Sequence, residues 1–161
     1  MSNLEIFIQQ HFGTLVKFYC HNNQMIQLPH LLTILPSLNT LVCGFNKLSV
    51  LPPLQSQLTT LYCSHNNLSH LPTLPVTLIY LYCDHNQLVD LPVLPNSLKE
   101  IYCRYNKLKK LPPLPINLNT LFCNNNQLIE LPPLPLTLIY FYCYCNQLID
   151  DNQANAFTIK I

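Results

Sequence analysis

Cysteine and asparagine recur in this sequence at a spacing regular enough to suggest chemistry. Six cysteines follow one another at intervals of twenty residues: Cys43, Cys63, Cys83, Cys103, Cys123 and Cys143. A disulfide framework and a zinc site are the two chemistries that such a series could support. An asparagine lies three residues after each cysteine, so the period belongs to a repeated structural unit and decides the architecture first.

The same period argues against both chemistries. In a stack of parallel strands, equivalent Cβ atoms lie about 4.8 Å apart, beyond the roughly 3.5–4.5 Å that a disulfide needs. A tetrahedral zinc ion needs sulfurs within about 3.8 Å of one another, and a straight row offers only two. We therefore predict that the cysteines are small buried packing residues and that the chain needs no metal and no cofactor. The structural cysteines are Cys63, Cys83, Cys103 and Cys123.

Composition excludes several other functions. The chain has 161 residues, 49% of them hydrophobic, which is enough for one domain with a continuous core. A net charge of +1 and a single arginine, Arg104, give no reason to expect nucleic acid or an anionic membrane as a partner. Two glycines cannot build a phosphate-binding loop, and no Ser-His-Asp order or Cys-His set is present. We expect no catalytic residues and no enzyme activity.

The repeated unit predicts its own secondary structure. Residues 80–84 alternate as a strand does, with Leu81 and Cys83 inward and Tyr80, Tyr82 and Asp84 outward. The proline-rich stretch that follows the turn in each unit cannot be helical, because proline lacks a donor and disfavours helix at the preceding residue. Each unit is thus predicted to be a strand, a turn and an extended polyproline-like return with inward leucines.

Seven such coils span residues 15–149. Residues 1–14 are predicted to form an N-terminal cap, a short amphipathic helix with Gly13 at its end. Three extra residues within 30–36 predict a bulge on the second return. Residues 150–161 are either a C-terminal cap or a truncated strand, and the sequence leaves both open.

The frame LxxLxCxxNxLxxLP, with a second LP in residues 71–75, resembles the leucine-rich repeat family and its short bacterial LPX subclass. That subclass occurs in effectors delivered into host cells, and similar arrays with cysteine in the strand occur in large DNA viruses. The resemblance implies a curved parallel solenoid that binds protein partners in a cytoplasm, including that of a host cell after delivery or infection. Some of these effectors carry a ubiquitin-ligase domain, an activity that we do not expect from residues 150–161.

The asparagines are predicted to be scaffold. A turn without helix leaves backbone groups unpaired, and an inward asparagine can bond the backbone of its own coil and of the adjacent coil. The structural asparagines are Asn46, Asn66, Asn86, Asn106 and Asn126.

The outward strand positions are predicted to carry the function. The residue before the cysteine is aromatic in six of seven coils, and exposed aromatic surface usually marks an interaction site. The alternative, that these rings only stabilise the sheet, stays open. The predicted binding residues of this concave face are Tyr62, Tyr80, Tyr82, Tyr102, Arg104, Phe122, Tyr140 and Tyr142.

The size of this face, roughly 500 Å² from seven strands, is below the 800 Å² or so of a standard interface. We therefore predict a monomeric, non-catalytic module that binds a peptide, a loop or a small domain. The alternatives are a substrate-recognition fragment of a larger ligase-like effector and a binder of carbohydrate or planar ligands.

Six residues with side chains that could do chemistry remain to be explained. Asp84, Glu100 and Arg104 are expected to pair with one another rather than to catalyse. His65 and His85 are expected to be solvated turn residues rather than metal ligands. Cys145 lies outside the regular row, and no basic neighbour in sequence marks it as a nucleophile, so its reactivity stays open.

Overall fold

Seven three-residue strands form one parallel sheet in the computed structural model, which describes residues 6, 9–30 and 35–149. The sheet follows the order of the sequence, and each strand pairs with the next in register, so that Tyr82 lies opposite Tyr102. The strands are β1 (Lys17–Tyr19), β2 (Thr40–Val42), β3 (Thr60–Tyr62), β4 (Tyr80–Tyr82), β5 (Glu100–Tyr102), β6 (Thr120–Phe122) and β7 (Tyr140–Tyr142).

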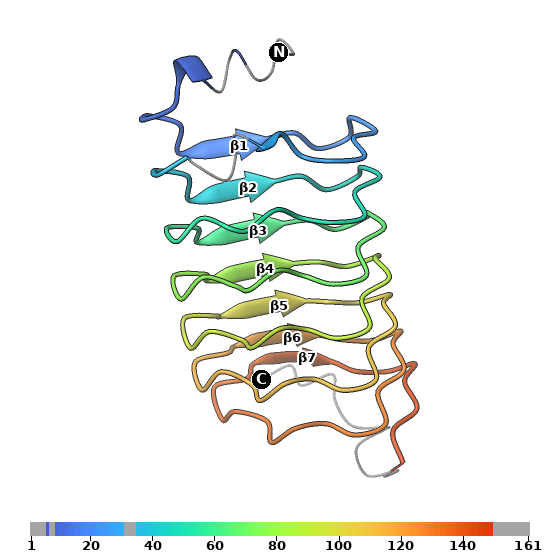
Figure 1. Cartoon of the computed structure of the whole chain (residues 1–161). Coiled ribbons are helices and arrows are strands. Elements are labelled where there is room, and N and C mark those ends of the chain that lie inside the picture. Colours follow the sequence, from blue (N-terminus) through green and yellow to red (C-terminus); the bar gives the residue numbers. More distant parts are fainter. Residues whose placement is uncertain (1–5, 7–8, 31–34, 150–161) are drawn as a thin grey trace.

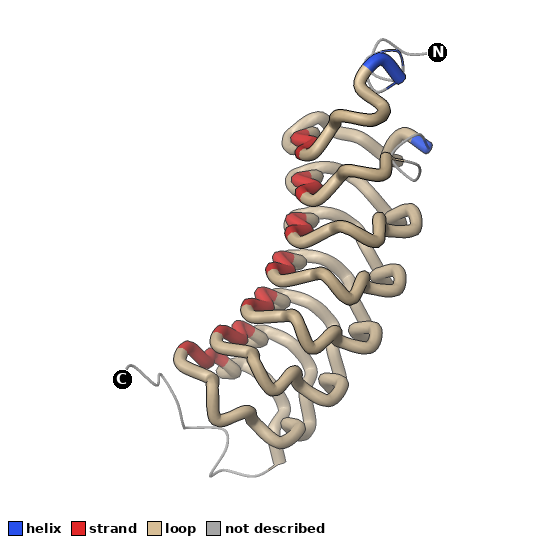
Figure 2. The backbone as a smooth tube through the Cα atoms, turned by 90° about the vertical axis from the view of Figure 1, so that its left-hand side faces the viewer, coloured by secondary structure: helices blue, strands red, loops and turns tan. Residues whose placement is uncertain are grey.

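The strands stack one above another along one side of a solenoid, and turns and returns without regular secondary structure close each coil (Figure 1). Seen from the side, the array curves so that the strands line its concave side and the returns its convex side (Figure 2). The prediction of a parallel leucine-rich-repeat solenoid with extended returns is confirmed.

One side of each strand and the leucines of each return build the core. The middle strand residue is fully buried, as at Leu81 and Ile101, and so is the cysteine that follows the strand, as at Cys83. On the return, Leu91 and Leu94 are 8% and 7% exposed. The alternation expected for a strand therefore holds as far as the cysteine.

The turn that follows each cysteine has a left-handed backbone two residues later. The φ angles of Phe45, His65, His85 and Tyr105 lie between 51° and 57°. For residues other than glycine this conformation costs roughly 1–2 kcal/mol, so other contacts must stabilise the turn. Asn125 and Cys145 share the conformation at the same position of the next two coils.

The N-terminal segment is helical at Ile6, Gln9 and Gln10 and turns at residues 11–14. The end of this segment differs from the prediction, because Gly13 does not take a positive φ. Instead, the backbone N–H groups of Thr14 and Leu15 both donate to the carbonyl oxygen of His11, at 3.0 Å.

Three predictions concern residues that the structure does not describe. Residues 1–5 and 7–8 of the predicted cap lie outside the described residues. The same holds for residues 31–34 of the predicted bulge and for the C-terminal segment 150–161. The division into cap, array and C-terminal segment stays a prediction. Within the described residues, no helix is long and apolar enough to span a membrane.

Candidate functional site

The asparagine that follows each cysteine fixes the turn. The Asn86 side-chain amide donates to the carbonyl oxygens of Cys63, Cys83 and Asp84 at 3.1–3.2 Å. Its Oδ1 atom accepts a hydrogen bond from the Leu68 backbone N–H at 3.0 Å. These are the bonds to its own coil and to the adjacent coil that the sequence predicts.

The same bonds repeat from coil to coil, so the turns have one geometry. The next asparagine, Asn106, contacts the carbonyl oxygens of Cys83, Cys103 and Arg104 and accepts from the Leu88 N–H. Five of these side chains are 7–9% exposed, so the bonds they make are shielded from water. These are Asn46, Asn66, Asn86, Asn106 and Asn126.

Four flat rings form a stack along these turns, which we call the turn row: Phe45, His65, His85 and Tyr105. Neighbouring ring centroids are 4.2 Å apart, and the planes diverge by only 12–13°. We did not predict this row from the sequence. The available signal was a ring-bearing residue two places after the cysteine in four consecutive coils.

Within the turn row, burial lowers the pKa of His85, and the neighbouring His65 lowers it further. The stack therefore disfavours protonation of His85, whose side chain still has an exposed edge. Among the described residues, no three His, Cys, Asp or Glu side chains come together in a way that could hold a metal ion.

A second row of rings lies on the concave face of the sheet, and we call it the strand row: Tyr62, Tyr82, Tyr102, Phe122 and Tyr142. Their centroids are 4.5–5.7 Å apart and their planes diverge by 36–63°, so each ring contacts the next in a different way. All five rings are half-buried.

The predicted binding residues share this concave face. The first and third residues of each strand point away from the buried middle residue, which places Tyr80 and Tyr140 on the same face as the strand row. Tyr140 is 50% exposed, and Tyr144, which contacts the Tyr142 ring, is 54% exposed. Arg104 follows β5 and completes the predicted set.

The sequence predicts that Asp84 points outward, but it does not predict that this side chain is covered. The residue is 6% exposed, because the strand alternation ends at Cys83 and the chain turns between the two rows of rings. Its carboxylate accepts three hydrogen bonds from Arg104: from the backbone N–H at 2.7 Å, from Nε at 3.0 Å and from Nη2 at 2.6 Å.

The Arg104 guanidinium is held between this carboxylate and the strand row. Its Cζ atom lies 5.5 Å from the ring centroids of both Tyr102 and Phe122, within the range of cation–π attraction. The hydrogen bond with Asp84 raises the pKa of Arg104 above its ordinary value, so the guanidinium keeps its charge. About a third of the Arg104 side chain stays exposed, at 36%.

The predicted pairing of the three charged residues is correct for Asp84 and Arg104 and wrong for Glu100. The Glu100 carboxylate accepts a hydrogen bond from the Tyr82 hydroxyl at 3.0 Å. Burial, followed by this bond, raises the pKa of Tyr82, so the hydroxyl stays protonated at neutral pH and donates the hydrogen bond. The concave face thus carries fixed donors and acceptors among its rings.

The cysteine row is buried along its whole length. All eight cysteines of the chain are free thiols, and only Cys145 is exposed. Burial raises the pKa of Cys20 to about 11 and that of Cys63 to about 12. These thiols are therefore protonated packing groups, which makes them poor nucleophiles.

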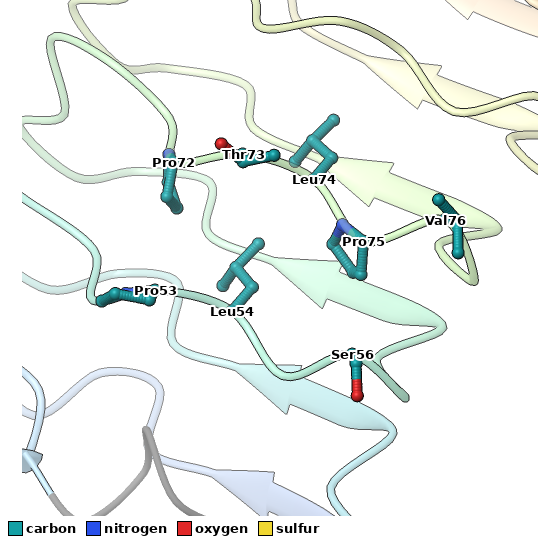
Figure 3. A pocket seen from close by; sticks show the side chains of 8 residues that line it. All are labelled: Pro53, Leu54, Ser56, Pro72, Thr73, Leu74, Pro75 and Val76. Atoms are coloured by element: carbon teal, nitrogen blue, oxygen red, sulfur yellow. The ribbon is translucent and has the colours of Figure 1, made fainter.

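An open groove of about 630 Å³ lies between two neighbouring returns on the convex side (Figure 3). It occurs where Gln55 and Ser56 replace the proline and the apolar residue of the next return, Pro75 and Val76. No charged or titratable side chain lines it, so the groove offers no group for acid–base chemistry. Its lining is Pro53, Leu54, Ser56, Pro72, Thr73, Leu74, Pro75 and Val76.

The parallel coils, the asparagine row and the leucine core define a repeat protein of the solenoid class. A profile of the Leucine Rich Repeat family matches residues 57–76. The fold is similar to YopM from Yersinia enterocolitica WA-314, with 38% identity, a TM-score of 0.78 and 82% of this chain covered. It is also similar to YopM from Yersinia pestis, described as a leucine-rich effector protein, with 40% identity, a TM-score of 0.77 and 83% covered.

The leucine-rich-repeat domain of a Shigella effector matches 94% of the chain, with 31% identity and a TM-score of 0.81. The chain belongs to the leucine-rich-repeat family, in the short-repeat form found in these bacterial effectors. The match covers 29%, 38% and 66% of the three structures, in the order given, so it spans only part of each of those proteins. No curated protein sequence matches the chain. The likeness to viral arrays stays a prediction.

Proposed function

We propose that the chain is a non-catalytic binding module and that its concave face holds a peptide or a loop of a protein partner. Leucine-rich-repeat arrays of this kind are interaction modules, and the effector relatives favour a host-cell protein as the partner. The observation that carries the proposal is the strand row, a continuous line of half-buried rings with one fixed guanidinium, that of Arg104, beside it.

The rings and the charge on this face suit a binding hot spot. Tyrosine and arginine are over-represented at such sites, since they combine large contact area with directional hydrogen bonds. The Asp84 carboxylate and the rings of Tyr102 and Phe122 hold Arg104 in place before any partner arrives. A partner therefore loses little free energy in ordering this side chain on binding.

Photo-crosslinking tests the face directly. A benzophenone amino acid at position 102, on the strand row, is expected to crosslink a partner in infected or transfected host cells. The same amino acid at position 93, an 85% exposed valine on the convex side, is the matched control. The captured protein, identified by mass spectrometry, is then titrated against the purified chain.

The double substitution Tyr82→Ala with Tyr102→Ala is expected to weaken that binding at least tenfold, or about 1.4 kcal/mol. Val76→Ala with Val93→Ala, both exposed on the convex side, is expected to leave the affinity unchanged. Equal crosslinking at positions 93 and 102, or full affinity in the tyrosine double variant, would refute a concave site. Binding to a glycan array without a protein crosslink would favour the carbohydrate alternative.

A further inference from the structure

The pentapeptide Leu-Pro-Pro-Leu-Pro occurs twice on the returns, at residues 111–115 and 131–135. Each proline fixes its own φ near −65° and holds the preceding residue in an extended conformation. Such a run is a polyproline II helix, in which residues three apart lie on one face. Neither copy contains regular secondary structure. The chain thus presents the same peptide on two neighbouring coils.

The inner copy is largely covered by its neighbours. Leu111 is 7% exposed, Pro115 is buried, and Leu114 is half-buried and packs on the core. Pro113 is exposed and Pro112 is half-buried, so the inner copy is open mainly on the face that carries Pro113. A groove that wraps around a polyproline II helix covers more than one of its faces, so the inner copy fits such a groove less well than a copy that is open on two faces.

The outer copy, in the last described return, is open on more than one face. Leu134 is 39% exposed, Pro133 is exposed, and Leu131 and Pro135 are half-buried. The residue that continues the helix, Leu136, is completely exposed at 105%. The same five residues therefore differ in accessibility because of their place in the stack.

The backbone of the outer copy can also accept hydrogen bonds. Within the described part of the chain, no donor reaches the carbonyl oxygens of Pro132, Pro133 or Leu134. Domains that recognise polyproline II segments dock them on aromatic rings, and tyrosine hydroxyl and tryptophan N–H groups can donate to such carbonyls.

We propose that residues 131–136 are a polyproline II ligand for a partner domain with an aromatic-lined groove of the WW type. Ile129 and Glu130 precede the segment and Leu136 and Thr137 follow it, so no cation adjoins the prolines in the sequence. A groove that also requires a lysine or arginine beside the prolines is therefore the wrong partner. The segment lies on the convex side, away from the strands, so this surface does not depend on the concave site (Figure 2).

The probe for the test is a purified WW domain selected for Pro-Pro-Leu-Pro peptides, titrated with the intact chain by calorimetry. The chain is expected to bind it, and Pro133→Ala with Leu134→Ala is expected to weaken binding at least tenfold. The matched control makes the same change in the inner copy, Pro113→Ala with Leu114→Ala, and is expected to leave binding unchanged. A synthetic peptide of residues 129–137 serves as the reference ligand.

Two further measurements keep the outcome clear. Urea unfolding of both variants shows whether each is folded under the conditions of the titration. An SH3 domain with an acidic specificity pocket is expected to bind less well than the WW domain. The proposal is overturned if the intact chain does not bind the WW domain, if the inner variant loses as much affinity as the outer one, or if binding increases as urea unfolds the chain.

Discussion

The two rows of rings are built from the same repeat, yet the rings lie differently in each. In the turn row, the planes are nearly parallel and every spacing is 4.2 Å. In the strand row, the planes diverge by up to 63° and the spacing varies from 4.5 to 5.7 Å. The difference follows from what holds each row.

The turn row is held by the backbone. The N–H of His85 donates to the carbonyl oxygen of Arg104 at 2.8 Å, and the bonds of the asparagine beside it recur in every turn. The strand row is held by side chains that change from coil to coil. Tyr62 lies over Gly44, the Tyr82 hydroxyl donates a hydrogen bond to Glu100, and Tyr102 lies beside Arg104. The variable row is therefore where one coil can differ from the next, and where recognition of a particular partner can be encoded.

The largest effect is expected from removing the support of the turn row. Asn86→Ala leaves the Leu68 N–H without its acceptor and removes one of the two side-chain donors to each of the Cys63 and Cys83 carbonyl oxygens. An unsatisfied buried group costs about 1–3 kcal/mol, and with the weakened carbonyl bonds we expect a total loss of about 3 kcal/mol in the free energy of unfolding. Urea denaturation measures it.

The neighbouring substitution Gln87→Ala is the control for Asn86→Ala. Gln87 is exposed, and its replacement is expected to change the free energy of unfolding by no more than about 0.5 kcal/mol. Similar losses in the two variants would mean that the asparagine bonds do not support the turn.

The asparagine bonds show how far the sequence could lead. A buried turn must satisfy its backbone, and an asparagine at a fixed interval can do so, which made the bonds of Asn86 predictable. The turn row was missed because period-two alternation does not extend into a left-handed turn, although a ring-bearing residue two places after the cysteine recurs in four coils. The burial of Asp84 was missed for the same reason, because the side chain lies between two rows of which only one was anticipated. The Glu100–Tyr82 bond depends on rotamers that no pattern encodes.

The second-largest effect concerns the charge between the rows. Asp84→Ala removes three hydrogen bonds to Arg104 and frees its guanidinium from the strand row. Bonds between charged groups contribute about 1.5–3 kcal/mol each when shielded, but Arg104 can turn to water, so we expect a loss of about 2 kcal/mol. Urea denaturation and the affinity for the captured partner both report it.

An exposed contact between an imidazole and a carboxylate of the same chain provides the contrast. His70 and Asp90 are joined at 3.0 Å, but their side chains are 61% and 58% exposed. Asp90→Ala is expected to cost under about 0.5 kcal/mol. If the two aspartate variants lost equal stability, burial between the rows would not be what gives the Asp84 pair its strength.

The third effect separates the two glycines and tests how closely the strand row is packed. A Cβ atom at Gly44 would lie 2.5 Å from Cε1 of Tyr62 and 2.9 Å from the Ser64 carbonyl oxygen, whereas one at Gly13 meets nothing within 4 Å. Gly44→Ala is expected to cost about 1 kcal/mol, and Gly13→Ala to stabilise by up to about 0.5 kcal/mol. Near-ultraviolet circular dichroism of the tyrosines should change only for Gly44→Ala. If Gly44→Ala did not lower the free energy of unfolding, the Tyr62 ring and the Ser64 backbone would be free to move.

The smallest expected effect is a pH dependence of stability that comes from the turn row and not from the strand row. Burial and His65 lower the pKa of His85, and the charge of Arg104 adds to this, while Asp84 opposes it. Below about pH 6.5, the unfolded chain takes up a proton at this position before the folded chain does. Stability therefore falls as the pH drops from there toward the lowered pKa, and no further below it.

His85→Asn removes this contribution, and Asn125 already adopts the same left-handed backbone in a later coil. Urea midpoints at pH 7.5, 6.5 and 5.5 should fall less in this variant than in the parent. His21→Asn, at an exposed histidine outside the turn row, controls for the loss of one titrating group. Because the strand row contains no histidine, parallel pH profiles for the parent and His85→Asn would mean that the turn row, despite its stacked imidazoles, is no more sensitive to acid than the strand row.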